Sequence, residues 1–232
     1  MILSAKKGKP EIFYSVQGEA TNLGVPCIFI RLFGCNLRCH FCDTSYTWNK
    51  ESIKMESKEV AKFIVKMKTP CNRIVITGGE PLLQQTEIVN LMKELDSLGT
   101  CFNLEIETNG TVVPIKELMD YVDVMNVSIK TSNSGNNLKQ SIKRLAIDSF
   151  VSHATCGENV YFKFVVKEAG DIAEIKKIIK KFKLIDIIIM PEGITPTKIL
   201  KGSKELVEVC KKEGWRFTPR LHTLLWGNTR AK

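Results

Sequence analysis

Strand-like and helix-like segments alternate along most of this 232-residue chain, and this alternation restricts the possible folds more than any other feature. The run 73–77 (RIVIT) has the apolar, β-branched character of a buried strand, whereas 87–98 repeats apolar residues at helical spacing. Strands that alternate with helices are typical of parallel β–α units. We expect strands at 27–32, 73–77, 103–107, 122–128, 160–166, 185–190 and 215–217, and helices at 58–67, 87–98, 172–182 and 204–213.

The number of these units decides between a closed and an open barrel. Roughly six or seven units fit in this length, which is too few for a complete eight-fold barrel. We therefore predict an α/β fold in a single domain, residues 1–232, built as an incomplete, open-sided TIM-type barrel of parallel strands. One stretch, 131–158, departs from the alternation, because it begins with the polar, loop-like sequence TSNSGNN.

Polar residues gather where the expected strands end. TGGEP (77–81) follows one strand, ETNG (107–110) the next, and SIK (128–130) and MPEG (190–193) follow two later ones. The carboxyl ends of parallel barrel strands form the face that carries the active site. The Gly78–Gly79 pair also allows backbone groups to approach a ligand closely. The sequence therefore predicts one functional face at these strand ends.

Three cysteines follow the first of these strands in the pattern C-x3-C-x2-C: Cys35, Cys39 and Cys42. Thiolates are the ligands that iron–sulfur clusters select. Three of them can hold three irons of a 4Fe–4S cluster and leave the fourth iron open to another ligand. Zinc bound by the three thiols and His40 is the alternative, but His40 lies between two of the cysteines and no second C-x2-C pair occurs.

Composition and charge exclude some function classes. Hydrophobic residues make up 44% of the chain, no apolar run reaches the length of a membrane span, and no secretory signal opens it. We expect a cytoplasmic protein without membrane contact, whose other five cysteines pack as small apolar residues. The net charge of +9 would suit nucleic acid, but the lysines fall mainly on helix faces, which favours a solvated surface and no nucleic-acid partner.

The cysteine triplet after one strand and Gly-Gly-Glu-Pro (78–81) after the next resemble the radical S-adenosylmethionine (radical SAM) enzymes. Within that superfamily the chain looks like the 7-carboxy-7-deazaguanine synthases, on the evidence of FYSVQGE (13–19), CDT (42–44), RLH (220–222) and WGN (226–228). The resemblance implies a carbon–nitrogen lyase that converts 6-carboxy-5,6,7,8-tetrahydropterin to 7-carboxy-7-deazaguanine with loss of ammonia. It also implies a 4Fe–4S cluster, S-adenosylmethionine and Mg²⁺ as cofactors, and a place in the biosynthesis of deazapurines such as queuosine.

Roles for individual residues follow from the same resemblance. Thr44 would hold the magnesium ion, and Arg31 would face the substrate carboxylate, which suits the paired donors of a guanidinium. S-adenosylmethionine would lie against Phe41, Cys42, Asp43, Gly79, Glu107, Ser128, Ile129 and Lys130, and the substrate against Val16, Gln17, Gly18, Arg31 and Thr77. Two positions depart from the family pattern: Ile129 replaces a common proline, and Ala20 a usual glycine.

Other readings stay open at this point. An activase that installs a glycyl radical on a partner protein shares the cysteine triplet, although residues 17–19 and Arg31 argue against it. A zinc-stabilised module that binds nucleic acid is a second alternative. A homodimer and an electron donor such as flavodoxin or ferredoxin are implied by the resemblance alone. Glu19 and Glu80 have no assigned role, and His40, His153 and His222 are expected to play no catalytic part.

Overall fold

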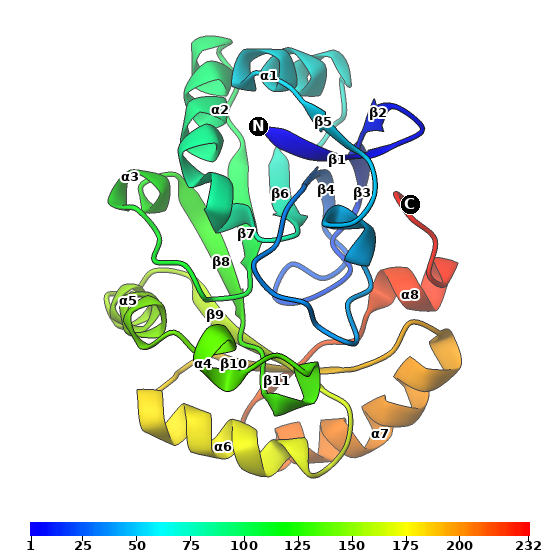
Figure 1. The fold of residues 1–232 in the computed structure, drawn as a ribbon, viewed down its shortest axis with the longest axis vertical. Coiled ribbons are helices and arrows are strands. Elements are labelled where there is room, and N and C mark those ends of the chain that lie inside the picture. Colours follow the sequence, from blue (N-terminus) through cyan, green and yellow to red (C-terminus); the bar gives the residue numbers. More distant parts are fainter.

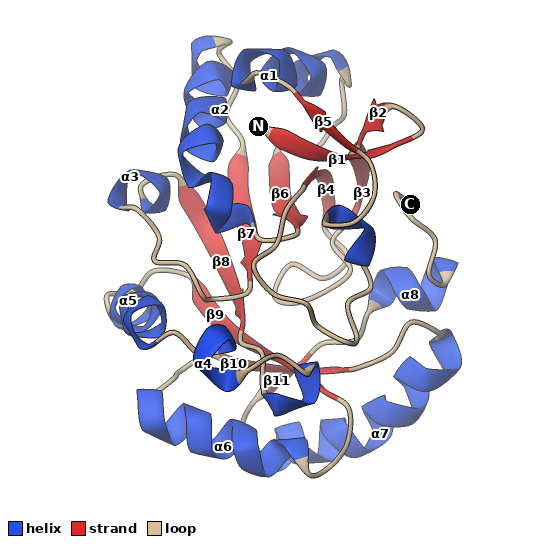
Figure 2. Cartoon of the chain, viewed as in Figure 1, coloured by secondary structure: helices blue, strands red, loops and turns tan.

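A computed structural model describes all residues, 1–232, and its centre is a curved sheet of seven parallel strands (Figures 1 and 2). In the sheet each parallel strand lies beside its neighbours in the sequence, in the order β4-β6-β7-β8-β9-β10-β11. The last strand, β11, pairs only with β10, so the barrel stays open. The strands are β4 (Pro26–Leu32), β6 (Arg73–Gly78), β7 (Asn103–Thr108), β8 (Val122–Ser128), β9 (Val160–Val166), β10 (Ile187–Pro191) and β11 (Arg216–Phe217). The predicted incomplete barrel is therefore confirmed.

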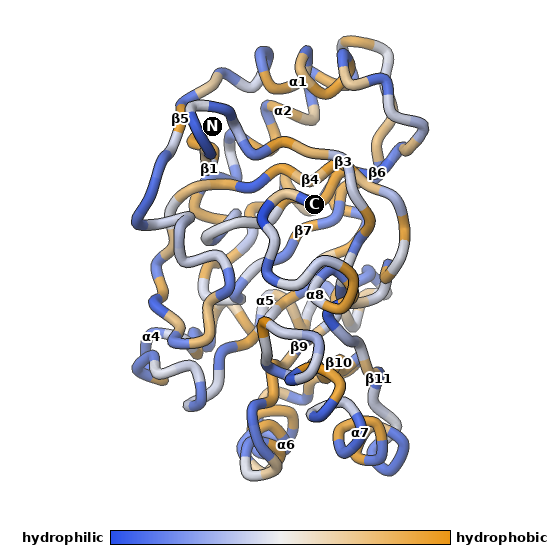
Figure 3. Tube along the Cα trace, turned by 90° about the vertical axis from the view of Figure 1, so that its right-hand side faces the viewer, coloured by the Kyte–Doolittle hydropathy of each residue, from blue (hydrophilic) through white to orange (hydrophobic).

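Helices connect the strands and cover the outside of the sheet (Figure 1). Forty buried apolar residues form one continuous core between the two layers. Apolar residues run through β9 and β10, whereas α6 and α7 alternate apolar and polar residues, as Figure 3 shows. The α-helices are α1 (Ser57–Lys66), α2 (Gln85–Ser97), α3 (Lys116–Met119), α4 (Leu138–Ser141), α5 (Arg144–Thr155), α6 (Asp171–Phe182), α7 (Pro196–Glu213) and α8 (Leu221–Trp226), with 3-10 turns η1 (Ser45–Thr47), η2 (Pro81–Gln84) and η3 (Ser132–Ser134). None of the helices combines the length and the apolar character that crossing a bilayer demands.

The amino-terminal residues extend the sheet with antiparallel strands that the sequence analysis did not predict. They are β1 (Ile2–Lys6), β2 (Lys9–Pro10), β3 (Ile12–Val16) and β5 (Ser52–Lys54). Strand β3 pairs with β4 through five residue pairs, from Ile12–Ile30 to Val16–Pro26. These strands are two to five residues long, so local periodicity gives little signal for them.

Several predicted element bounds differ from the structure, and two of the differences have a local reason. Helix α7 begins at Pro196, earlier than the predicted 204, because the Thr195 hydroxyl accepts a hydrogen bond from Lys198 N and proline favours the first turn. Helix α1 begins at Ser57 rather than after it, and Glu59 closes its first turn by accepting from Glu56 N at 2.8 Å. The irregular stretch 131–158 contains α4 and α5, which were not predicted.

Candidate active site

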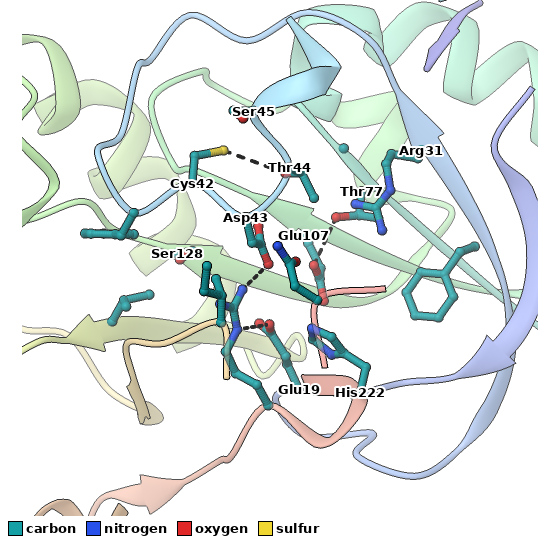
Figure 4. A pocket seen from close by; sticks show the side chains of 18 of the residues that line it. Glu19, Arg31, Cys42, Asp43, Thr44, Ser45, Thr77, Glu107, Ser128 and His222 are labelled. Atoms are coloured by element: carbon teal, nitrogen blue, oxygen red, sulfur yellow. Dashed lines mark hydrogen bonds and ion pairs between the residues drawn. The ribbon is translucent and has the colours of Figure 1, made fainter. Parts of the chain in front are cut away.

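A cavity of about 510 Å³ opens at the carboxyl ends of the parallel strands (Figure 4). Its lining comes from the loop after β4, from the ends of β6, β7, β8 and β10, and from the carboxyl-terminal segment. Because all these strands run parallel, their ends bring together residues from positions 13 to 232. The polar strand ends picked out from the sequence therefore converge on one face of the sheet.

The three cysteines lie on the loop that follows β4, and all three are free thiols on the cavity wall. Hydrogen-bond donors point at two of the sulfurs: Leu37 N lies 3.4 Å from Cys35 Sγ, and Asn136 Nδ2 lies 3.1 Å from Cys39 Sγ. Burial raises the pKa of the Cys35 thiol. Three soft thiol ligands on one loop, with donors already aimed at them, fit an iron–sulfur cluster.

The spacing of the thiols does not fit a single zinc ion. Tetrahedral zinc with zinc–sulfur bonds of about 2.3 Å brings its sulfurs to within about 3.8 Å of one another. The group of three potential ligands that lie within 4.8 Å of each other is Glu19, Asp43 and His222, not the cysteines with His40. His40 is exposed, and its backbone N–H donates to Ser134 O at 2.9 Å. A larger, multi-iron group suits the wider spacing.

Gly79 fixes the end of β6 against the cysteine loop. A side chain at this position would overlap the backbone carbonyl of Gly34, the residue before Cys35. The next amide, Glu80 N, donates to the same carbonyl at 2.8 Å. The glycine is therefore required by close packing of two backbones, whereas the sequence suggested close approach of the backbone to a ligand.

Glu80 is fully buried and holds together the loops that follow β6 and β7. Its carboxylate accepts hydrogen bonds from Leu82 N at 3.0 Å, Thr108 Oγ1 at 2.7 Å and Asn109 N at 2.6 Å. Burial raises the pKa of Glu80, although these three donors act in the opposite direction. The carboxylate is saturated by internal donors and does not line the cavity, so its role is structural.

A buried network of charges lies in the cavity, and Figure 4 shows two of its members, Glu19 and Asp43. Glu19 pairs with Lys163 at 2.5 Å and with Arg220 at 3.0 Å, and Arg220 also contacts Asp43. Burial alone would raise the pKa of Glu19, but Lys163 and Arg220 outweigh it and hold that pKa well below its ordinary value. Burial likewise opposes the charge on Asp43, and Arg220 lowers its pKa.

Sequence analysis missed most of this network. Arg220 stands 201 residues from Glu19 and Lys163 stands 144 residues from it, and neither belongs to a local charge pattern. His222, which was expected to have no catalytic part, lies in the cavity beside Glu19 and Asp43, and burial lowers its pKa. The RLH segment (220–222) was a usable signal, because charged side chains there follow the last strand of the sheet.

A second polar group lies where β3 approaches β7. Gln17 Nε2 donates to Glu105 Oε1 at 2.6 Å and to Glu107 Oε1 at 3.1 Å, and Thr77 Oγ1 donates to Glu107 Oε2 at 3.0 Å. Glu105 is fully buried, and burial raises its pKa. Gln17, Thr77 and Glu107 therefore hold each other in place while all three border the cavity.

Arg31 reaches the cavity from β4 and keeps most of its donors free. Its Nε lies 3.9 Å from Glu11 Oε2 and has no hydrogen-bond partner although it is buried. Glu11 is already occupied by Arg230, whose Nε and Nη2 donate to its two oxygens at 2.6 and 2.9 Å. A strong structural ion pair for Arg31 is thus absent, and the guanidinium can accept an anionic group.

The structure gathers fifteen of the sixteen site residues suggested by the sequence around this one cavity. They are Val16, Gln17, Gly18, Arg31, Cys35, Cys39, Phe41, Cys42, Asp43, Thr44, Thr77, Gly79, Glu107, Ser128 and Lys130. Ile129 differs, because its side chain is 2% exposed and packs in the core, away from the cavity. A contact from Ile129 to a ligand would have to come from its backbone.

Comparison with known proteins agrees with this geometry. The model of the radical SAM superfamily matches residues 29–151. The chain is 34% identical to the 7-carboxy-7-deazaguanine synthase of Pyrobaculum aerophilum, over 96% of both chains, and 31% identical to that of Halobacterium salinarum, over 94% of this chain and 90% of the relative. The crystal structure of QueE from Escherichia coli superposes with a TM-score of 0.69 at 25% identity, covering 91% of this chain and 92% of that one.

The open parallel barrel and its loop of three free thiols define a radical SAM enzyme, a class that uses a 4Fe–4S cluster and S-adenosylmethionine. At 34% identity over nearly its full length, the chain belongs to the family of the 7-carboxy-7-deazaguanine synthases. The resemblance noted from the sequence is thus confirmed, and neither the glycyl-radical activase nor the zinc module is favoured.

Proposed function

We propose that this protein is a radical SAM lyase that converts 6-carboxy-5,6,7,8-tetrahydropterin to 7-carboxy-7-deazaguanine with loss of ammonia, in deazapurine biosynthesis. The observation that carries the proposal is that one cavity holds both the three thiols and the available guanidinium of Arg31. The three thiols would hold the cluster at which the radical is generated, and the guanidinium matches a substrate that carries a carboxylate.

The cofactors divide between two parts of the cavity. Cys35, Cys39 and Cys42 would bind the cluster, and when bound, cluster and S-adenosylmethionine supply the 5′-deoxyadenosyl radical that takes a hydrogen atom from the substrate. S-adenosylmethionine would lie against the side chains of Phe41, Cys42, Asp43, Glu107, Ser128 and Lys130 and the backbone of Gly79 and Ile129. Lys130 Nζ donates to Ser128 Oγ at 2.6 Å, which holds this half-buried side chain at the wall.

The substrate would occupy the part of the cavity between β3 and β4. Arg31 would bind its carboxylate, while Val16, Gln17, Gly18 and Thr77 would border the ring. Because Gln17 and Thr77 are already bonded to Glu107, these groups are positioned before the substrate arrives. Fixing the carboxylate directs which hydrogen is removed, and no general base is required for that step.

Magnesium is a further part of the proposal. Thr44 lines the cavity two residues after Cys42, and its hydroxyl lies 3.8 Å from the Cys42 sulfur. Magnesium takes few protein oxygens and completes its octahedron with substrate and water oxygens. One threonine hydroxyl together with a substrate carboxylate would suit this preference.

Several wider properties are proposed from family membership. We infer a homodimer, an external one-electron donor such as flavodoxin or ferredoxin, a single domain over residues 1–232 and a cytoplasmic location. Free thiols at all eight cysteines are compatible with a reducing compartment. A small-molecule substrate is supported by the size of the cavity, about 510 Å³, and no nucleic-acid or membrane partner is proposed.

Anaerobic turnover of the reconstituted enzyme with the carboxypterin, S-adenosylmethionine and a reductant tests the proposed function. We expect 7-carboxy-7-deazaguanine and ammonia, with a higher rate when magnesium is present. Alanine in place of Cys35, Cys39 or Cys42 should abolish the product, because the cluster loses a ligand, while alanine in place of the exposed Cys101 should not. Absence of product from enzyme that carries its full iron and sulfide would contradict the substrate assignment.

A further inference from the structure

The polar segment 131–137, which interrupts the alternation of strands and helices, packs directly against the cysteine loop. Ser134 O accepts the backbone N–H of His40 at 2.9 Å, and Asn136 Oδ1 accepts that of Arg38 at 2.8 Å. The amide nitrogen of Asn136 lies 3.1 Å from Cys39 Sγ. Three hydrogen bonds therefore connect this segment to the residues that surround one cluster ligand.

The orientation of the Asn136 amide is fixed by its neighbours. Backbone N–H of Arg38 can only donate, so the amide oxygen of Asn136 must face it. The amide nitrogen then faces Cys39 Sγ and, also at 3.1 Å, the hydroxyl of Ser134. A flipped amide would place its N–H₂ against the Arg38 donor. The group that faces the sulfur is therefore an N–H donor.

The segment is held rigidly enough to keep that donor in place. Ser134 is fully buried and its hydroxyl donates to Thr131 O at 2.7 Å. Asn133 Nδ2 donates to Val165 O at 2.9 Å and to Asp171 Oδ2 at 2.7 Å, which ties the segment to β9 and α6. Gly135 has φ +74°, and a side chain there would overlap the ring of His40.

The other two thiols lack an equally close side-chain donor. Asn109 Nδ2 is 3.9 Å from Cys35 Sγ and already donates to Asn36 Oδ1 at 2.9 Å. The Thr44 hydroxyl is 3.8 Å from Cys42 Sγ. Of the three cysteines, Cys39 therefore has the closest side-chain donor, the amide of Asn136.

We propose that Asn136 is a positioning residue for the 4Fe–4S cluster that raises the cluster's reduction potential through its N–H···S bond to Cys39. The reduced cluster carries one more negative charge than the oxidised one, so a donor dipole at a ligand sulfur stabilises the reduced state more. The electron comes from an external one-electron reductant, as the proposed function requires. The inference rests on the cysteine loop binding that cluster.

The direct test is a redox titration of reconstituted, full-length enzyme without S-adenosylmethionine, followed by electron paramagnetic resonance. Asn136→Leu and Asn136→Asp both remove the N–H donor, and the second also adds a negative charge. We expect both variants to shift the midpoint potential to lower values, the aspartate variant by more. An unchanged potential in both variants would overturn the proposal.

Asn137→Asp is the matched control, because it adds the same charge one residue further on. The Asn137 side chain accepts from Lys139 N at 2.9 Å, a role that aspartate can keep, and residue 137 is exposed. We expect this variant to leave the potential near that of the wild type. An equal shift for Asn137→Asp and Asn136→Asp would assign the effect to charge alone and would contradict a hydrogen bond to Cys39.

A second measurement uses the unchanged protein and does not depend on folding of a variant. Labelling with ¹⁵N-asparagine should give a nitrogen coupling to the reduced cluster in pulsed electron paramagnetic resonance, and the coupling should persist in the Asn109→Asp variant. No coupling in the wild type, or its loss in that variant, would overturn the proposal. Iron and sulfide counts on the same samples report separately on whether the cluster, and hence the proposed function, is present.

Discussion

Glu19 shows how single side chains in this active site depend on one another. The carboxylate is 7% exposed, yet it stays charged because Lys163 and Arg220 each contact one of its oxygens. Arg220 is in turn shared with Asp43 and with the carbonyl of Gly193, at 2.9 Å for the latter. Removing one member leaves the others as buried charges without a full set of partners.

We expect Glu19→Gln to lower the free energy of unfolding at neutral pH by about 3 kcal/mol, because Lys163 and Arg220 lose a buried counter-charge. The pKa of Glu19 is lowered from its ordinary value of 4.5, so its stabilisation is complete above that pH and declines as the pH falls further. The difference between wild type and variant should therefore shrink below about pH 4.5. Urea unfolding of the cluster-free chain from neutral to acid pH measures this, and a difference independent of pH would contradict the ion-pair account.

At the scale of elements, the end of β6 and the beginning of the cysteine loop form one structural unit. Strands β4 and β6 pair from Ile28–Ile74 to Leu32–Gly78, and the contact continues beyond the strands as Glu80 N donates to Gly34 O. The cysteine loop is also held from its other side, since Gly34 N donates to Thr47 O at 2.7 Å. The position of Cys35 is thus set by two neighbouring strands together with the Gly34–Thr47 bond within the loop region.

A side chain at Gly79 should separate these elements. We expect Gly79→Ala to reduce stability by about 3 kcal/mol and to lower the iron bound after reconstitution, because the added carbon meets a backbone carbonyl that cannot move aside. Thermal melts and iron counts measure the two effects.

Gly99→Ala provides the comparison. Gly99 has φ +70° at the end of α2 with open space around it, so alanine there should cost about 1 kcal/mol of strain and leave the iron content unchanged. Equal iron content in the two variants would show that the contact between Gly79 and Gly34 does not position the loop.

For the whole molecule, the two ends of the chain meet beside the active site. Arg230 bonds to both oxygens of Glu11, donates to Ala5 O at 2.6 Å and lies 3.7 Å from the ring centre of Tyr46. The Ser15 hydroxyl donates to Lys232 O at 2.5 Å. The last residues therefore cover one side of the cavity and are anchored on the antiparallel strands.

Arg230→Met should lower the free energy of unfolding by about 2 kcal/mol, because Glu11 is 3% exposed and would retain only the distant Arg31 as a cationic partner. Arg144→Met is the control, since Arg144 forms an exposed pair with Asp148 on α5 that should contribute under about 0.5 kcal/mol. Chemical denaturation of both variants measures the contrast. Equal effects would mean that the carboxyl-terminal anchor behaves as an ordinary surface ion pair.

The sequence determined the local properties of this protein. Its apolar, β-branched runs located all seven parallel strands, and its 3.6-residue periodicity located four of the helices, because these patterns record which parts of each element are buried. The cysteine spacing indicated thiolate ligands for an iron–sulfur cluster, and TGGEP indicated a close approach of the backbone at the end of β6. Together these features were sufficient to predict an open parallel barrel with an iron–sulfur loop at its carboxyl face.

Tertiary structure decided which distant residues meet. Glu19, Lys163 and Arg220 become partners only when β3, β9 and the segment after β11 converge, and Asn136 reaches Cys39 only because segment 131–137 folds back over the cysteine loop. Neither contact could be predicted from local sequence patterns, since the interacting residues are separated by 97 to 201 positions. The partners that the fold supplies then set the pKa of each buried glutamate. The pKa of Glu80 is raised, because its partners are neutral hydrogen-bond donors, whereas the pKa of Glu19 is lowered, because its partners are the cations Lys163 and Arg220.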